Sequence, residues 1–505
     1  MKALNRILAL AALLIPLSSG AAQRDTQTQK LVSGYARKEP LRSGILGVFA
    51  MRGADTLAQY NRTLKMVPAS NVKLLTTGLA LNRLGPEMRF ETLLAHTGTI
   101  QDGILDGDLY IVGGGDPTIA SGSSCADSLS LTFSRWKALL DADGIKVIKG
   151  RVVGDSRFFK RPSHGMSWQM EDIGYNYGAG PSGLNYFENA QVFSLRAGQL
   201  GEPPVINTMY PDTPWMSYVN SAVTGPSGTG NTVYYINTEF APVGEFQGNF
   251  PVDRRETKLE CSNPFGAYTC AYFFHNYLLC NGITVEGGFA DVSPRGTVRS
   301  DLLFSDMGPA AVSPAELKPI GTCKSPELWR IVKDTNYDSD NFYAETLFNM
   351  LSYSVYGHAD RDSSALAAYE LMNGLGLQTE NCCRLIDGSG LSRKDYVSPE
   401  FFVRFLKKMY SCPVRDYFLE SLPYPGSKST LKNRMRTASA DVKARVKMKS
   451  GSMNGVLCFS GYILSPNGDR SKTIVFSILT NNVTARSSTV ATILDDIILS
   501  LALEP

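Results

Sequence analysis

Apolar residues recur at helical spacing in the segment that follows Ser70. They are Val72, Leu74, Leu75, Leu79 and Leu81, and the pattern stops at Gly85-Pro86. This spacing predicts a buried helix with Ser70 at its start. Val67 precedes Pro68 and is therefore held extended, as a chain entering a helix here requires. The free N–H groups at a helix start favour developing negative charge, so Ser70 occupies a chemically useful position.

Strand-like patterns dominate the C-terminal end. The apolar runs 455–465 and 471–479 are joined through Pro466-Asn467-Gly468, which is a strong hairpin signal. A final helix is predicted over 487–503, and its two aspartates favour a helix covering a sheet over a membrane anchor. With another predicted strand at 45–52, these elements indicate an antiparallel sheet covered by helices.

The middle of the chain changes character. Short apolar runs at 107–113, 150–154 and 231–237 are separated by Gly, Pro, Asn and Asp, and they predict mostly β structure. After about residue 325 the helical spacing returns, over 342–353 and 364–375. The predicted fold class is therefore α+β.

Three short polar motifs follow one another along the chain. They are Ser70-Asn71-Val72-Lys73, Ser339-Asp340-Asn341 and Lys449-Ser450-Gly451. A serine hydroxyl is a weak nucleophile until a base takes its proton, and a lysine of lowered pKa is such a base. At positions i and i+3 of a helix, Ser70 and Lys73 share one face and can touch. The Ser-x-x-Lys pattern also occurs at 134–137 and 429–432, so taken alone Ser70 reads better as a helix N-cap.

The motif spacing predicts a divided catalytic domain. Lys73 and Ser339 are 266 positions apart, whereas Ser339 and Lys449 are only 110 apart. A compact catalytic domain does not need the first separation, so a large insertion is expected after the nucleophile helix. We expect the catalytic domain over 23–95 and 305–505, and an inserted, mostly β region over 96–304.

The N-terminus predicts export. Lys2 and Arg6 precede an apolar run and then small residues up to Ala22, which is the layout of a secretory signal peptide over 1–22. The expected compartment is the periplasm, with no transmembrane segment after signal removal. Charged residues make up 19% of the chain, the net charge is +3, and no basic stripe is present. This composition argues against nucleic acid as a partner.

The nine cysteines and four histidines limit which disulfides, metal sites and catalytic triads the chain can form. In an exported protein Cys261–Cys270 is the first disulfide to test, with scattered buried thiols as the open alternative. No histidine has metal-ligand spacing, so no metal or cofactor is expected, and a serine–histidine–aspartate triad has no support. The sequence does not indicate an oligomeric state.

The three motifs in this order are those of penicillin-binding proteins and serine β-lactamases. The segments 67–91, 114–118, 339–346, 387–399 and 447–462 further resemble exported D-alanyl-D-alanine carboxypeptidases/endopeptidases, the class C low-molecular-mass penicillin-binding proteins. The resemblance implies a penicillin-binding/serine β-lactamase-like catalytic domain interrupted by the insertion. Two departures are Asp395, where members more often carry asparagine, and Ser450 in place of threonine.

The resemblance implies a role for each matched catalytic residue. Ser70 attacks the carbonyl of a D-Ala-D-Xaa bond, and Lys73 acts as its base. Ser339 relays a proton to the leaving amine, while Lys449 lowers nearby pKa values and steers the substrate carboxylate. Asn341 holds both Lys73 and the substrate amide.

The same resemblance implies the substrate contacts. Ser450 hydrogen-bonds the terminal carboxylate, Gly451 completes its motif, and the backbone N–H groups of Ser70 and Ser452 form the oxyanion hole. Asp172 matches an aspartate that receives the free amino end of the stem-peptide diamino acid, and an exposed loop acid is the open alternative.

The implied activity is hydrolysis of peptidoglycan stem peptides and cross-links, with β-lactam antibiotics as covalent inhibitors. Two alternatives stay open. A β-lactamase or esterase would use the same Ser–Lys pair, but it would need no insertion, and the chain has no distinct deacylating acid motif. A non-catalytic wall-binding protein would have no need to keep Ser70, Lys73, Ser339 and Lys449.

Overall fold

The computed structural model describes residues 26–160, 164–304 and 308–505. The predicted signal peptide at 1–22 lies outside them. Among the described helices, none combines the length and the apolar character that crossing a bilayer requires.

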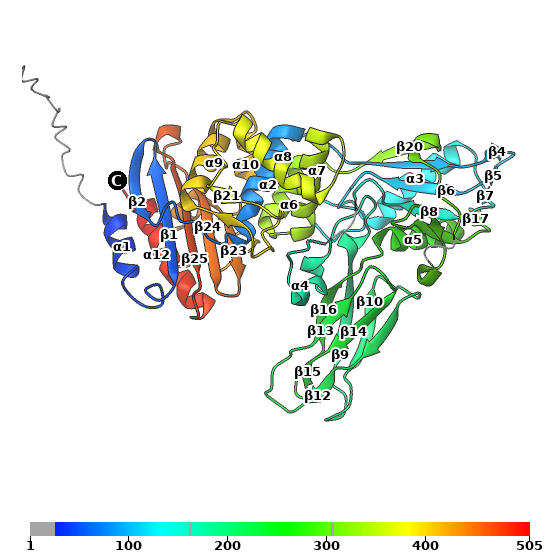
Figure 1. The fold of residues 1–505 in the computed structure, drawn as a ribbon, viewed down its shortest axis with the longest axis horizontal. Helices are drawn as coiled ribbons and strands as arrows, with labels where there is room; N and C mark the ends of the chain where they lie inside the picture. Colours follow the sequence, from blue (N-terminus) through cyan, green and yellow to red (C-terminus); the bar gives the residue numbers. More distant parts are fainter. Residues whose placement is uncertain (1–25, 161–163, 305–307) are drawn as a thin grey trace, which may run out of the picture.

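A five-stranded antiparallel sheet contains the C-terminal hairpin (Figure 1). In order across the sheet, its strands are β2 (Asp55–Tyr60), β1 (Ile45–Arg52), β25 (Ile474–Asn481), β24 (Val456–Ile463) and β23 (Val446–Met453). The strands predicted at 45–52, 455–465 and 471–479 are thereby confirmed. All eight residues of the central strand β25 are buried, because helices cover both faces of this sheet.

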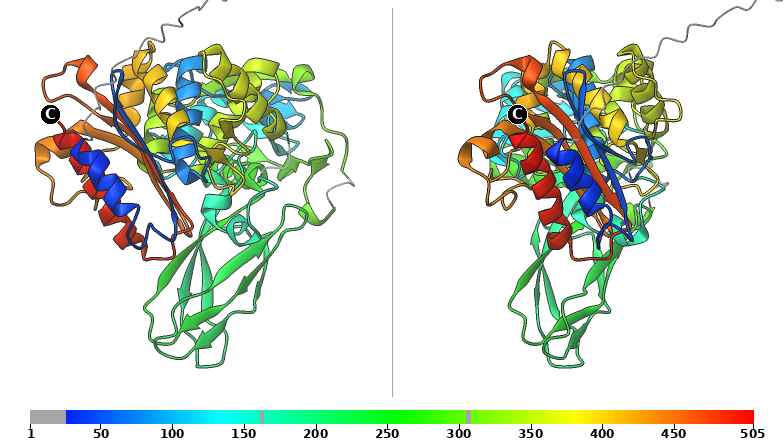
Figure 2. Two further views of the ribbon diagram at one scale, coloured as in Figure 1. Left: turned by 60° about the vertical axis from the view of Figure 1, so that its left-hand side comes forward. Right: turned by 90° about the vertical axis from the view of Figure 1, so that its left-hand side faces the viewer.

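The two terminal helices lie side by side over one face of this sheet, as Figure 2 shows. They are α1 (Gln27–Tyr35) and α12 (Ser487–Leu503), so the last helix is confirmed as a cover for a sheet. Thr28 and Ser500 share a hydroxyl hydrogen bond of 2.8 Å, and Tyr35 Oη donates to Asp496 Oδ2 at 2.7 Å. The first and last helices of the described residues are thus joined by hydrogen bonds.

The other face of the sheet packs against a helical layer in one hydrophobic cluster. Its helices are α2 (Val72–Leu84), α6 (Leu328–Tyr337), α7 (Asn341–Tyr356), α8 (Arg361–Gly374), α9 (Pro399–Ser411) and α10 (Arg415–Ser421). The helices predicted after Ser70, over 342–353 and over 364–375 correspond to α2, α7 and α8. The first two of the three polar motifs therefore lie at the starts of helices that pack on the sheet carrying the third.

A six-stranded sheet forms the part of the insertion next to the helical layer. Its strands, in order, are β19 (Val298–Arg299), β18 (Phe289–Val292), β8 (Val152–Asp155), β6 (Leu109–Gly113), β3 (Glu91–His96) and β20 (Lys318–Lys324). A small second sheet joins β17 (Thr284–Val285), β7 (Val147–Ile148), β5 (Ile104–Asp106) and β4 (Thr99–Gln101).

The predicted boundaries of the insertion do not coincide with this sheet. Strand β3 crosses the boundary at residue 95, and β20, which lies after residue 305, pairs with β3 along its length. The region also contains two long helices that the strand-like composition did not indicate, α3 (Leu129–Ala142) and α5 (Gly266–Cys280). They bury Trp136 and Phe274 in the same core as the strands.

The remainder of the insertion is a β lobe that projects below the molecule in Figure 1. One of its sheets joins β10 (Val205–Tyr210), β9 (Ala190–Arg196) and β16 (Thr257–Ser262). The others join β11 (Ser217–Asn220), β14 (Val243–Gln247) and β13 (Tyr234–Asn237), and β12 (Val223–Gly225) with β15 (Asn249–Pro251). Phe193, Phe246 and Tyr235 fill the core of this β lobe.

All nine cysteines lie within the described residues, and each is a free thiol. The suggested Cys261–Cys270 disulfide is therefore absent: Cys261 lies on β16 and Cys270 inside α5, and both are buried in separate hydrophobic clusters. The alternative of scattered thiols describes these residues better, although only Cys261, Cys270 and Cys458 are buried.

Candidate active site

Ser70 lies in a short 3₁₀ turn, Ala69–Asn71, that leads directly into α2. The preceding Ala69 has φ +46°, a left-handed conformation that is strained for a residue with a Cβ and is found mainly where the surroundings enforce it. The turn directs the hydroxyl toward the next turn of the helix, where Lys73 Nζ is 3.0 Å from Ser70 Oγ. The predicted pair is therefore in contact.

Lys73 is fully buried, and its ammonium position is defined by two carbonyl oxygens. Its Nζ donates to Asn341 Oδ1 at 2.6 Å and to the backbone oxygen of Ser389 at 2.8 Å. Burial lowers the pKa of Lys73 to about 8, against an opposing effect of three nearby carboxylates. When the amine is neutral, these two acceptors use both of its N–H bonds. Its lone pair is then left to face Ser70.

The other two motifs meet on the opposite wall of the site. Ser339 stands before α7 with φ +60°, and Lys449 Nζ donates to its Oγ at 2.8 Å. A second hydrogen bond runs from Lys449 Nζ to the backbone oxygen of Ser450 at 2.8 Å. Burial, and then the charge of Lys73, lower the pKa of Lys449 well below its usual value.

Lys449 to Gly451 lie within the edge strand β23, which leads into β24, the first strand of the C-terminal hairpin. A Cβ on Gly451 would stand 2.7 Å from Pro68 O and 3.0 Å from Ser70 N, so only glycine lets this strand approach Ser70 so closely. Ser450 Oγ shares a hydrogen bond of 2.8 Å with Thr430 Oγ1, at the exposed edge of the strand.

A loop over residues 387–392 provides the backbone oxygen of Ser389 that accepts from Lys73. Glu345 Oε1 accepts from the backbone N–H groups of Gly388 and Ser389, at 3.0 and 2.8 Å. Glu345 is in turn paired with Arg361 at 2.6 Å. The carbonyl of Ser389 is therefore held in place for Lys73 by a charged pair that is almost wholly out of water.

An open cleft of about 350 Å³ is lined by four of the nine predicted site residues. Ser70, Asn341, Ser452 and Asp172 all line it, while Lys73 and Lys449 lie buried beneath its floor. Asp172 belongs to the short helix α4 (Met170–Ile173) and accepts a hydrogen bond of 3.3 Å from Tyr177 Oη. Partial burial raises the pKa of Asp172, and the Tyr177 hydrogen bond opposes this rise.

Three residues of the candidate site were not found from the sequence. The backbone oxygen of Tyr177 accepts from Asn341 Nδ2 at 2.8 Å, which ties the insertion to the second motif. Arg393 lines the cleft and donates to Gln169 Oε1 at 3.0 Å. Ser389 acts through its carbonyl, and since every residue has a carbonyl, no sequence signal marks this one.

The decoy Ser-x-x-Lys motifs lie elsewhere. Ser134 is exposed on α3 and donates to the Leu131 carbonyl, while Lys137 pairs with Asp141 at 2.8 Å. Ser429 shares a hydrogen bond with Ser427 instead of with a lysine. Neither motif has a buried lysine beside its serine.

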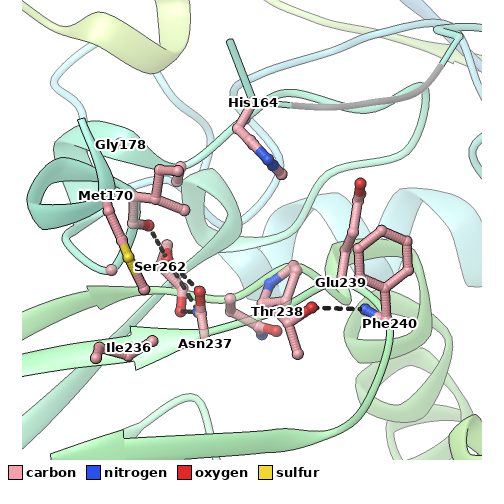
Figure 3. A pocket seen from close by; sticks show the side chains of 15 residues that line it. His164, Met170, Gly178, Ile236, Asn237, Thr238, Glu239, Phe240 and Ser262 are labelled. Carbon is pink, nitrogen blue, oxygen red and sulfur yellow. Dashed lines mark hydrogen bonds between the residues drawn. The ribbon is translucent and has the colours of Figure 1, made fainter. Parts of the chain in front are cut away.

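A separate pocket of about 190 Å³ lies between α4 and the β lobe, and Figure 3 shows the side chains around it. Asn237 Nδ2 donates to the carbonyl of Ser262 at 2.7 Å on its floor. None of the residues of the three motifs lines it. Within the described ranges, no group of three or more His, Cys, Asp or Glu is placed to hold a metal ion.

Comparison with known proteins identifies the family of this chain. The model of the D-Ala-D-Ala carboxypeptidase 3 (S13) family matches residues 29–498. A D-alanyl-D-alanine carboxypeptidase of Actinomadura sp. (strain R39) is 28% identical over 484 residues, which is 92% of this chain and 83% of that protein. The D-alanyl-D-alanine carboxypeptidase DacB of Haemophilus influenzae is 25% identical over 416 residues, 82% of this chain and 81% of that one.

The fold agrees with these sequence relatives. The crystal structure of penicillin-binding protein 4 (dacB) from Haemophilus influenzae matches with a TM-score of 0.78 at 23% identity, over 93% of this chain and 99% of that one. The predicted penicillin-binding fold is thereby confirmed. The family match covers nearly the whole chain, and this protein belongs to the D-Ala-D-Ala carboxypeptidase 3 (S13) family.

Proposed function

We propose that this protein is a serine-type D-Ala-D-Ala carboxypeptidase and endopeptidase that acts on peptidoglycan stem peptides and cross-links through an acyl-enzyme on Ser70. The observation that carries the proposal is the environment of Lys73. A buried amine with a pKa of about 8 lies 3.0 Å from Ser70 Oγ, and both of its other hydrogen bonds go to fixed carbonyl oxygens. Such an amine can take the serine proton near neutral pH.

The steps follow from the contacts. Neutral Lys73 removes the proton of Ser70 as Oγ attacks the carbonyl carbon of the penultimate D-alanine, and the backbone N–H groups of Ser70 and Ser452 stabilise the resulting oxyanion. Ser339 Oγ accepts from Lys449, so Ser339 passes its own hydrogen to the leaving nitrogen and takes a proton from Lys449 in return. The C–N bond breaks, the amine departs protonated, and water later hydrolyses the ester on Ser70.

The remaining contacts select the substrate. Ser450 and the Lys449 charge lie where a terminal carboxylate would be bound, and Asp172 borders the cleft that contains Ser70. Asp172 would bind the distal ammonium of the stem-peptide diamino acid. Cleavage of a terminal D-alanine and of a cross-link break the same kind of D-Ala amide, so one site serves both activities.

The proposal also includes covalent inhibition by penicillins and a periplasmic location. A β-lactam carbonyl would acylate Ser70 in place of the peptide, and the Haemophilus influenzae penicillin-binding protein 4 has been crystallised in complex with a β-lactam. The layout of residues 1–22 supports export to the periplasm.

Mass spectrometry after incubation with benzylpenicillin tests the proposal. The wild-type protein should gain the mass of one penicilloyl group, and Ser70→Ala should gain none while keeping its fold. The matched changes Ser134→Ala and Ser429→Ala should leave acylation intact. Retained acylation in Ser70→Ala would contradict the assignment.

Hydrolysis assays on a pentapeptide and on a cross-linked muropeptide dimer then divide the two peptidase activities. Faster turnover of benzylpenicillin than of either peptide would favour a β-lactamase instead. Absence of any acyl-enzyme would favour a non-catalytic wall-binding protein.

A further inference from the structure

A groove of about 780 Å³ opens beside the catalytic cleft. The two share a wall made of Gln169, Glu171, Asp172 and Tyr177. The volume is within the range of small-ligand sites, and none of the proposed catalytic steps uses this space. A substrate that extends beyond Asp172 would therefore enter the groove.

Aromatic side chains form two walls of the groove. The rings of Tyr175 and Tyr177 are stacked, with centroids 5.3 Å apart and planes within 10°, and Tyr234 stands on β13. Each of these three tyrosines is held in position by an interaction with another residue. Tyr177 Oη donates to Asp172, Tyr234 Oη donates to Gln247 Oε1 at 2.5 Å, and the Tyr175 backbone bridges to Cys261. The ring faces are thus fixed before any ligand arrives.

The charge of the groove restricts its ligand. Its lining contains the two carboxylates of Glu171 and Asp172 and no lysine, arginine or histidine. An acidic ligand such as a second stem peptide is disfavoured there, because its carboxylates would face these acids. A neutral ligand rich in hydroxyl groups suits the groove, since hydroxyls donate to carboxylates and flat C–H faces pack on aromatic rings.

We propose that this groove binds the sugar strand to which the stem peptide is attached, with Tyr175, Tyr177 and Tyr234 packing against the sugar rings. The inference rests on the proposed function, because the peptide in the cleft determines where the sugar enters. The groove is then a specificity site for glycan-linked peptides over free peptides.

The pocket of Figure 3 extends this path. It shares Met170 and Ile236 with the groove, and its rim bears Phe240, which is 87% exposed. Thr238 Oγ1 accepts from Phe240 N at 3.2 Å and steadies the turn that presents this ring. A glycan longer than one disaccharide would therefore contact a further apolar surface beyond the groove.

The test compares one pentapeptide in two forms, free and attached to its N-acetylglucosamine–N-acetylmuramic acid disaccharide. The wild-type protein should show the higher kcat/KM on the disaccharide form. Tyr234→Ala should lower kcat/KM on that form by about threefold to tenfold and leave the free pentapeptide unchanged, because Tyr234 lies outside the cleft. Tyr234→Phe keeps the ring face and should retain most of the preference. Tyr60→Ala, at a tyrosine that is 36% exposed on β2, is the matched control.

Direct binding of the peptide-free disaccharide, followed by NMR on the intact wild-type protein, keeps the inference falsifiable if Tyr234→Ala fails to fold. Binding should be observed, and it should be lost in Tyr234→Ala and kept in Tyr60→Ala. Equal kcat/KM on the two forms in wild type, no disaccharide binding, or an equal loss on both forms in a folded Tyr234→Ala would each overturn the glycan site. Failure of the proposed function would look different: neither peptide form would be cleaved and benzylpenicillin would not acylate, whereas the disaccharide measurement would still decide the groove.

Discussion

Replacing Asp395 with asparagine should stabilise the protein increasingly as the pH rises. The Asp395 side chain is fully buried, and its Oδ1 accepts a hydrogen bond of 2.6 Å from Ile386 N. Its Oδ2 meets no N–H or O–H donor. The carboxyl group interacts with Asp387, whose oxygens already accept three N–H groups. Two such acids satisfy each other only if one of them keeps a proton.

The sign of the pH effect follows from this arrangement. Burial, and then the charge of Asp387, raise the pKa of Asp395 well above its usual value, so the folded protein holds a proton that the unfolded chain releases. The contribution to stability is full below the pKa of the unfolded chain and is lost as the pH rises toward the folded-state pKa. Within that window each pH unit removes about 1.4 kcal/mol. An asparagine amide provides the same acceptor and donor at every pH.

The free energy of unfolding in urea, measured for both proteins from pH 5 to pH 8, tests this reasoning. The advantage of Asp395→Asn over wild type should widen by up to about 1.4 kcal/mol per pH unit. Asp395→Ala removes both hydrogen bonds and should be destabilised by about 1–3 kcal/mol. A constant difference between Asp395→Asn and wild type across this range would refute the raised pKa of Asp395.

Three further predictions concern the cleft. Acylation by benzylpenicillin should accelerate by about tenfold per pH unit below pH 8 and level off above it, because the pKa of Lys73 is about 8 and only the neutral amine is a base; a flat profile between pH 6 and 8 would contradict this. Gly451→Ala should slow acylation by about a hundredfold, because its Cβ would push β23 away from Ser70, whereas Gly122→Ala has open space and should not, as stopped-flow measurements would show. Asp172→Asn should lower kcat/KM by about tenfold for stem peptides with a free side-chain amine. Its acylation by benzylpenicillin should change little, so equal losses would instead indicate a structural role for Asp172.

Local patterns in the sequence were sufficient to predict several helices and strands around the candidate site. The apolar spacing after Ser70 predicted α2, and the apolar runs on either side of Pro466-Asn467-Gly468 predicted β24 and β25. These elements are determined by side-chain periodicity and turn chemistry, which act over a few residues. The order of the three polar motifs was likewise readable, because each motif carries its own reactive groups.

Tertiary structure alone decided how these pieces work together. The pairing of β20 with β3 across more than two hundred residues placed the edge of the insertion, and helix α5 is rich in aromatic residues that locally favour strands. The pKa of Lys73 depends on burial, and its second acceptor is the carbonyl of Ser389, which lies 316 residues away. The raised pKa of Asp395 likewise exists only where folding buries this carboxyl group beside Asp387. Sequence determined which groups are present and their local geometry, whereas desolvation and long-range contacts set their chemistry, because both depend on residues distant in the chain.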